Sequence, residues 1–285
     1  MTPLVFSLVA AGALAHATWN LTIKRAGTTG AGFLWLTFAL GALVFAPFGI
    51  WSLLSDGADL ARWAGFAAVS GALQVGYFLL LQRGYRAGDV SVVYPLARGT
   101  GPVLSVVLAI AVLGERPGWP AIVGAAIVVT GVVTIGLAGR RSGGHANRAG
   151  VLFGLAIGVV IAVYTLWDAT AVTAGGLPVV GLYWGSLVVQ TALLAPWALR
   201  ERDLVAVLVA HRAAVPIVAV LAPLAYILIL LAVQLASVSV VAPAREVSVV
   251  LVSLAGWLWF REPHPGQRLA GAAVVLLGVG VLTVG

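Results

Sequence analysis

Four charged residues lie inside long apolar stretches of the chain, where an ionised side chain is costly to bury. They are Arg98, Asp168, Arg245 and Glu246. A charge at the centre of a bilayer costs at least about 2.5–3.5 kcal/mol on insertion scales, so such residues bind substrates, carry protons or pair with one another. We expect the chemistry of this protein to depend on these four residues.

Arg98 and Arg245 each lie about eight residues into an apolar segment. The planar guanidinium group binds carboxylates, phosphates and phosphonates through two parallel hydrogen bonds. Two such groups close together would suit an anionic group of a substrate. The alternative is a structural pair of arginines, held by carboxylates or by the carbonyl groups of a broken helix.

The two buried carboxylates have several possible roles. Glu246 could neutralise Arg245, reach Arg98 or carry a coupling proton, because a buried carboxylate can bind and release protons near neutral pH. Asp168 could be an ammonium site or a proton site. It could instead be an interfacial residue whose side chain extends toward water.

Polar and aromatic residues complete the candidate substrate site. His16 and Asn20 are four residues apart and share a helix face, as do Tyr164 and Asp168. Polar pairs on one face of an apolar helix point toward the bundle interior, where partners exist. Aromatic residues could cap or stack on a substrate, or could anchor helix ends at the membrane surface. The aromatic candidates are Tyr94, Tyr77, Tyr226, Trp167 and Trp19.

The composition indicates the kind of protein that must position these residues. The chain has 285 residues, of which 61% are hydrophobic and 9% charged, whereas soluble domains carry about 25% charged residues. It is therefore expected to be a membrane protein. The net charge of +7 comes from basic residues scattered over short loops. Such residues set the orientation of the chain at an anionic membrane face, and they do not indicate binding of nucleic acid.

Several kinds of chemistry are excluded by what the sequence lacks. With no cysteine, it offers neither disulfides nor thiolate metal sites, and no second histidine lies at ligand spacing from His16. There is no phosphate-binding loop, zincin motif or nucleophile elbow, so ATP hydrolysis within this chain is excluded. We expect no metal, no cofactor and no enzyme.

Spanning helices need roughly 20 apolar residues each, and backbone groups in lipid must be satisfied within the segment. The chain is therefore predicted to be an all-α integral membrane protein with ten transmembrane helices. The first segment is expected to be a helix of the mature protein, because it has no basic start. The segments lie at about 3–22, 32–54, 63–83, 90–113, 119–138, 150–171, 178–198, 213–233, 238–259 and 267–284.

The two halves of the chain repeat one another at an offset of 147–149 residues. Residues 115–131 match residues 262–278, and Arg98 aligns with Arg245, whereas Gly99 aligns with Glu246. We predict a first five-helix repeat at 1–139, a linker at 140–149 and a second repeat at 150–285. Because five is an odd number, two tandem repeats must be inverted in the membrane.

Prolines and glycines indicate how the repeats are built. Pro95 and Pro243 lie several residues inside equivalent segments and could break both helices, which would mark a transporter site. The glycine stripes at 150–158, 124–131 and 271–278 are expected to pack helices closely, with dimerisation as a lesser option for the stripes at 124–131 and 271–278. Glu115 and Glu262 are expected to cap the next helix or to pair with the neighbouring Arg116 and Arg261.

Loop charges predict the orientation. Loops after the odd-numbered segments carry twelve basic residues, and the opposite loops carry only Arg62 and Arg116. The positive-inside rule therefore places the odd-numbered loops in the cytoplasm and both termini outside an inner membrane. The twelve residues are Lys24, Arg25, Arg83, Arg86, Arg140, Arg141, Arg148, Arg200, Arg202, Arg212, Arg261 and Arg268.

Three motifs carry a resemblance to a known family. Residues 114–117 read Gly-Glu-Arg-Pro before a glycine-rich helix, 261–263 repeat Arg-Glu-Pro, and 16–24 hold His-Ala-Thr-Trp-Asn followed by Lys24. Over essentially its whole length the chain resembles a drug/metabolite transporter of the EamA type. It departs from the pattern in lacking a counterpart of Lys24 in its sixth segment.

The resemblance implies a secondary active transporter with two five-helix repeats. Its expected partners are a small-molecule substrate, the lipid bilayer and a coupling proton, in a monomer or homodimer. Export of small polar metabolites such as amino acids by alternating access is the first expectation. A carrier of a small organic anion such as a phosphonate is the alternative, suggested by the two arginines. A membrane-embedded enzyme is less favoured, because the chain has no long interfacial loop to hold catalytic residues.

Overall fold

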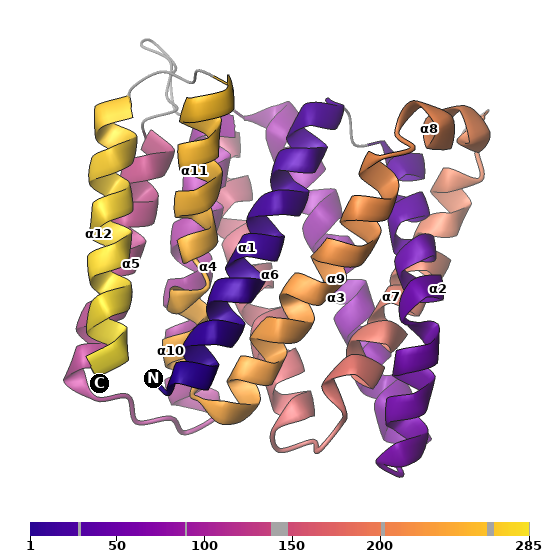
Figure 1. Ribbon diagram of the computed structural model, residues 1–285, viewed down its shortest axis with the longest axis horizontal. Helices are drawn as coiled ribbons and strands as arrows, with labels where there is room; N and C mark the ends of the chain where they lie inside the picture. The colour runs from indigo at the N-terminus through magenta and orange to yellow at the C-terminus, as the bar shows by residue number, and fades with distance from the viewer. Residues whose placement is uncertain (28–29, 89, 138–147, 201–202, 261–264, 285) are drawn as a thin grey trace.

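The computed structural model describes residues 1–27, 30–88, 90–137, 148–200, 203–260 and 265–284, and within these ranges every regular element is a helix (Figure 1). The predicted all-α membrane class is confirmed. Nine described segments are long and apolar enough to span a bilayer, and a tenth, α5, is shorter. The helices are α1 (Pro3–Ala26), α2 (Ala31–Ser55), α3 (Leu60–Ala87), α4 (Val90–Val112), α5 (Trp119–Leu137), α6 (Arg148–Val172), α7 (Val179–Ala198), α8 (Leu204–Ala210), α9 (Ala214–Leu235), α10 (Val238–Ala244), α11 (Val247–Phe260) and α12 (Pro265–Val284).

Helix ends follow local capping rules. The Thr2 side chain accepts a hydrogen bond from the Val5 N–H at the start of α1, and Asp59 accepts bonds from two N–H groups at the start of α3. Gly27 ends α1 with φ of 83°, a left-handed conformation that suits glycine. The polar breaks between apolar segments therefore set the helix boundaries.

Helices α5 and α12, the last of each repeat, cross in opposite directions. A Cβ on Gly124 would lie 2.9 Å from the Gly278 carbonyl oxygen, and one on Gly131 would lie 2.7 Å from that of Gly271. As the residue number increases along α5, the number of the facing residue on α12 decreases. The two helices are therefore antiparallel, as inversion of the repeats requires. The predicted packing role of these glycines is confirmed, and their faces are occupied within the chain.

The remaining contacts come in pairs that repeat the same symmetry. Helix α1 packs on α9, and its counterpart α6 packs on α3. Helix α4 packs on α6, where Gly154 and Gly158 allow close approach to α4, and α11 correspondingly packs on α1. Both chain ends lie at one end of the bundle (Figure 1). The two repeats therefore interlock, and helices of both enclose the centre.

Helix breaking differs between the repeats. In the second repeat α10 ends at Ala244 and α11 begins at Val247, with the Glu246 N–H bonded to the Pro243 carbonyl at 3.0 Å (Figure 1). In the first repeat α4 continues through Pro95, so the expected break there is wrong. The asymmetry has a physical reason. Adjacent residues on a regular helix do not face each other, yet Glu246 contacts Arg245, and the residue aligned with Glu246 is Gly99.

Glu115 caps a helix of the other repeat. Its carboxylate accepts backbone hydrogen bonds from Val238 at 2.7 Å and Ser239 at 3.0 Å, at the start of α10. The sequence predicted capping of the next helix, α5, and that assignment is wrong, because the loop carrying Glu115 lies beside α10. Glu262 and Arg261 lie outside the described residues.

Helix α8 was not predicted. It has seven residues, is capped by the Asp203 side chain at its start, and exposes Val205 and Val209. It lies between α7 and α9 and packs on α2. Seven residues rise roughly 10 Å, so α8 is too short to span a bilayer.

Candidate functional site

A central cavity of about 130 Å³ lies between helices of both repeats. Its polar lining comes from α1, α2, α3, α4, α6, α7, α9 and the junction of α10 with α11, and the rest is apolar or aromatic. Among the predicted candidates, those that line it are His16, Trp19, Tyr77, Arg98, Tyr164, Tyr226 and Arg245. Residues from both halves of the sequence, far apart along the chain, therefore share one site.

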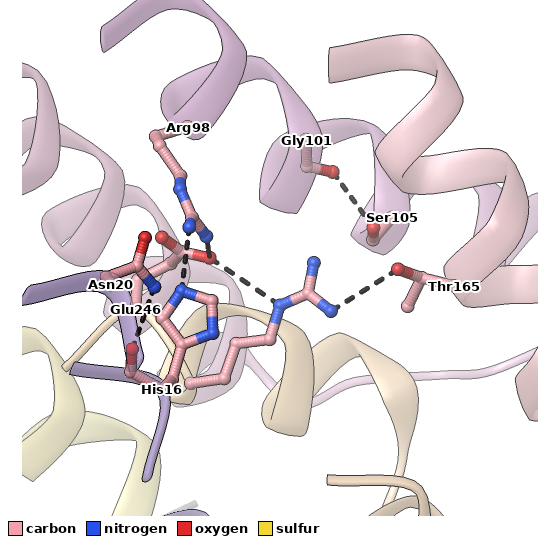
Figure 2. A network of polar contacts seen from close by, with 8 residues as sticks. His16, Asn20, Arg98, Gly101, Ser105, Thr165 and Glu246 are labelled. Carbon is pink, nitrogen blue, oxygen red and sulfur yellow. Dashed lines mark hydrogen bonds and ion pairs between the residues drawn. The ribbon is translucent and has the colours of Figure 1, made fainter. Parts of the chain in front are cut away.

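Two arginines that line the cavity meet one buried carboxylate. One oxygen of Glu246 lies 3.6 Å from Arg98 Nη1 and 3.5 Å from Arg245 Nε. Figure 2 shows Glu246 between the two guanidinium groups. The Glu246 side chain is 1% exposed, and its other oxygen has no hydrogen-bond partner among the described residues. Two cations share one anion, so the group carries a net charge of +1.

His16 holds Arg98 from the other side. Its Nε2 lies 2.8 Å from Arg98 Nη2 (Figure 2). Arginine can only donate hydrogen bonds, so Nε2 must be the acceptor and the imidazole proton must lie on Nδ1. The Asn20 amide donates to the His16 carbonyl at 2.8 Å, so Asn20 turns toward its own helix and does not line the cavity.

Each arginine has a further contact outside the carboxylate. Arg245 Nη1 donates to the Thr165 hydroxyl on α6 at 3.4 Å. The Arg98 guanidinium carbon lies 5.7 Å from the centre of the Tyr94 ring, within the range of a cation–π contact. Tyr94 therefore supports Arg98 and is not among the residues that line the cavity.

A row of tyrosines forms one wall. The rings of Tyr77 and Tyr164 are 6.2 Å apart, those of Tyr164 and Tyr226 are 5.9 Å apart, and Tyr183 follows at 5.1 Å from Tyr226. The first two pairs meet edge to face and the third is tilted, and all three distances are favourable for aromatic pairs. Trp167 lies elsewhere, since its ring packs on Phe66 and its Nε1 donates to the Phe66 carbonyl. Its predicted place in the cavity lining is therefore wrong.

Asp168 lies behind the tyrosine wall. It is 0% exposed, so its alternative assignment as an interfacial residue is wrong. Its Oδ2 accepts a hydrogen bond from the Tyr226 hydroxyl at 2.8 Å. Tyr226 lines the cavity and Asp168 does not, so the tyrosine stands between them.

A buried cluster of neutral polar residues was missed by the sequence analysis. Gln74 donates to the hydroxyls of Ser70 and Ser186, and Gln190 donates to Ser186 and to the Gln74 carbonyl. Ser70 and Gln74, and likewise Ser186 and Gln190, are four residues apart on otherwise apolar helices. The spacing that singled out His16 and Asn20 would have found both pairs.

The cavity extends from the middle of the bundle toward one end. Its lining on α2 lies in the half nearest Ala31. Its lining on α1 and α9 runs from Gly12 and Ile229, beyond the middle of each helix, to Ile23 and Val218 near the ends beside the basic loops. At the opposite end, Trp63 stacks on Trp184 with their ring centres 5.9 Å apart, and the Trp63 indole donates to the Gly181 carbonyl. Aromatic packing therefore closes one end of the bundle, and the cavity extends toward the other end.

Comparisons with known proteins agree with this architecture. The model of the EamA-like transporter family, of the drug/metabolite transporter superfamily, matches residues 4–137 and again residues 148–284. A crystal structure described only as that of a protein is similar in fold, with a TM-score of 0.79 and 20% identity over 98% of this chain and 96% of the other. A comparison with curated proteins gives no match.

Proposed function

Because the chain belongs to the EamA-like transporter family, we propose that it is a secondary carrier for small carboxylate-bearing metabolites such as amino acids. In this proposal it exports them across the inner membrane by alternating access between two repeats, at 1–139 and 150–285. One observation carries the proposal: Arg98 and Arg245, one from each repeat, reach the same central cavity. Secondary carriers bind substrate at such repeat interfaces near the middle of the bilayer.

The charge balance supports a substrate with an anionic group. Glu246 cancels only one of the two guanidinium charges, and its contacts of 3.5 and 3.6 Å are longer than charge-assisted hydrogen bonds of about 2.7–2.9 Å. A substrate carboxylate can therefore replace Glu246 and form shorter bonds to both arginines. Glu246 then acts as an internal stand-in for the substrate carboxylate whenever no substrate is bound.

The rest of the cavity supports a small substrate with an apolar body. Its volume of about 130 Å³ corresponds to about four water molecules at roughly 30 Å³ each. The tyrosine wall offers aromatic faces, and the hydroxyls of Thr37 and Ser248 and the amide of Gln74 offer hydrogen bonds. An amino acid satisfies both requirements.

A small organic anion such as a phosphonate is the second candidate. The net charge of +1 at the arginines favours it, and no carboxylate lines the described part of the cavity to receive an ammonium group. A phosphonate has more acceptor oxygens than a carboxylate and could engage both guanidinium groups at once. The two candidates differ in the group bound and share the site.

The experiment is a thermal-shift screen of the purified protein against amino acids, phosphonates and cationic drugs. We expect an amino acid or a phosphonate to raise the unfolding temperature, and cationic drugs to leave it unchanged. The screen is repeated on Arg98→Ala and Arg245→Ala, which should lose the shift. Arg62→Ala, far from the cavity, is the matched control and should keep it. Binding that survives the loss of both arginines would contradict the proposed site.

A further inference from the structure

Asp168 is the most completely buried carboxylate outside the arginine group in the described chain. It is 0% exposed and has one hydrogen-bond donor, the Tyr226 hydroxyl at 2.8 Å. Its Oδ1 is buried with no hydrogen-bond partner among the described residues. The Ser70 hydroxyl faces this carboxyl group but lies 3.3 Å from the Ser186 hydroxyl, to which it is bonded.

No cation neutralises Asp168 in the described structure. The ion pairs at the cavity join Arg98 and Arg245 to Glu246, and Asp168 forms none. The helices packed on α6 are α3, α4, α7, α9 and α10. The titratable or charged groups that they and α6 itself present on this side are Tyr77, Tyr94, Arg98, Tyr183, Tyr226, Arg245, Glu246 and Tyr164.

The two buried carboxylates therefore have opposite environments. Glu246 lies between two permanent cations and is already paired with both of them. Asp168 is bonded to the Tyr226 hydroxyl and lies near Tyr164, Tyr183 and Ser70. A buried carboxylate without a partner becomes neutral instead of remaining charged. Of the two carboxylates that the sequence offered as proton sites, the surroundings favour Asp168.

Binding of a substrate ammonium group is not supported at Asp168. An ammonium group would have to touch the carboxylate, and the Tyr226 side chain lies between the carboxylate and the cavity. A proton needs no such access. A tyrosine hydroxyl can donate one hydrogen bond while accepting another, so Tyr226 can pass a proton between the cavity and Asp168.

We propose that Asp168 is the proton-binding site of this carrier and that Tyr226 connects it to the substrate cavity. The uptake of one proton converts the carboxylate, with a charge of −1, to a neutral carboxylic acid, and its release restores the charge. The neutral acid donates through its new O–H to the Tyr226 oxygen or to a serine hydroxyl. The coupling of this proton to transport rests on the proposed carrier function, whereas proton binding itself does not.

Infrared difference spectroscopy tests proton binding without any substrate. A protonated carboxylic acid has a carbonyl band separate from that of a carboxylate. In the wild-type protein this band is expected at acidic pH and is expected to disappear as the pH is raised. Asp168→Asn should lose it, since the amide keeps the shape and still accepts from Tyr226. Glu246→Gln should retain it. A band that persists in Asp168→Asn, that is lost in Glu246→Gln, or that is absent from the wild type would overturn the proposal.

Coupling is tested in proteoliposomes with L-alanine and aminomethylphosphonate as probes. A pH gradient should drive accumulation by the wild type, and a sodium gradient should not. Asp168→Asn should lose gradient-driven accumulation but keep exchange of labelled for unlabelled probe, since the arginine site is intact. Tyr226→Phe should slow accumulation while leaving the infrared band. Accumulation that follows sodium, or that survives in Asp168→Asn, would refute coupling at this residue. Failure of the probes to bind at all would instead count against the arginine site.

Discussion

Replacing Glu246 with glutamine should tighten the binding of anionic ligands, because the substitution removes an internal competitor. Each contact of its oxygen with an arginine is 3.5–3.6 Å long, and the Coulomb energy at that distance is about 5 kcal/mol for an effective dielectric constant of about 20. Hydrogen bonds to charged groups contribute only about 1.5–3 kcal/mol net, since desolvation offsets much of the attraction. A ligand that no longer has to displace the carboxylate gains this amount of about 1.5–3 kcal/mol, which corresponds to roughly 10–150-fold tighter binding.

The same substitution should destabilise the empty protein. Removing one partner of a buried ion pair costs about 3–5 kcal/mol, because the remaining charges lose their compensation. Glu246→Gln is therefore expected to unfold at a lower temperature without ligand and to regain more stability than the wild type with ligand.

The assay is calorimetric titration of purified protein with L-alanine and with aminomethylphosphonate, at matched ionic strength. Glu115→Gln is the matched control, because it also removes a partly buried carboxylate but lies away from the cavity. The ligand affinity of this variant should equal that of the wild type. If a folded Glu246→Gln protein bound both probes no more tightly than the wild type, the idea that Glu246 occupies the anion site would be refuted.

Three further predictions concern the scaffold and the access route. Glu115→Gln should lower the free energy of unfolding by about 1.5–3 kcal/mol, because two backbone N–H groups lose a charged acceptor, and denaturation in detergent measures this loss. Gly131→Leu should prevent folding, since even its Cβ would lie 2.6 Å from Val275, whereas Gly280→Leu on the same helix pair meets open space and should fold, as size-exclusion profiles will show. The chain has no cysteine, so Ser248→Cys supplies a single thiol in the cavity, and an impermeant maleimide should label it mainly from the side of the basic loops; equal labelling from the opposite side would contradict the closed end.

The fold was largely predictable because a bilayer leaves few options to an apolar chain. Backbone groups in lipid require helices, and a copied segment such as 115–131 requires symmetry between the halves. The arginines were predictable for the same reason, since a charge in an apolar segment is expensive. These rules act on local sequence, so they need no knowledge of which helices touch.

The features that the sequence did not predict depend on contacts between distant residues or on smaller burial energies. Gln74 and Gln190 are neutral, so burying them costs less free energy than burying a charge. Their presence in an apolar segment is therefore a weaker signal of a functional site. The partners of Glu115 lie more than 120 residues away along the chain, and no local rule connects them. The break after Ala244, absent from α4, depends on the contact of Glu246 with two arginines.

The crossing of α5 and α12 has a mechanical consequence. Their glycines bring backbone against backbone, and among the described residues none of the cavity lining comes from either helix. In the proposed alternating-access mechanism, this pair would stay fixed while the helices around the cavity tilt on either side of it. Because α5 and α12 do not contact the substrate cavity, the side chains that line the cavity can change without disturbing the packing of this helix pair.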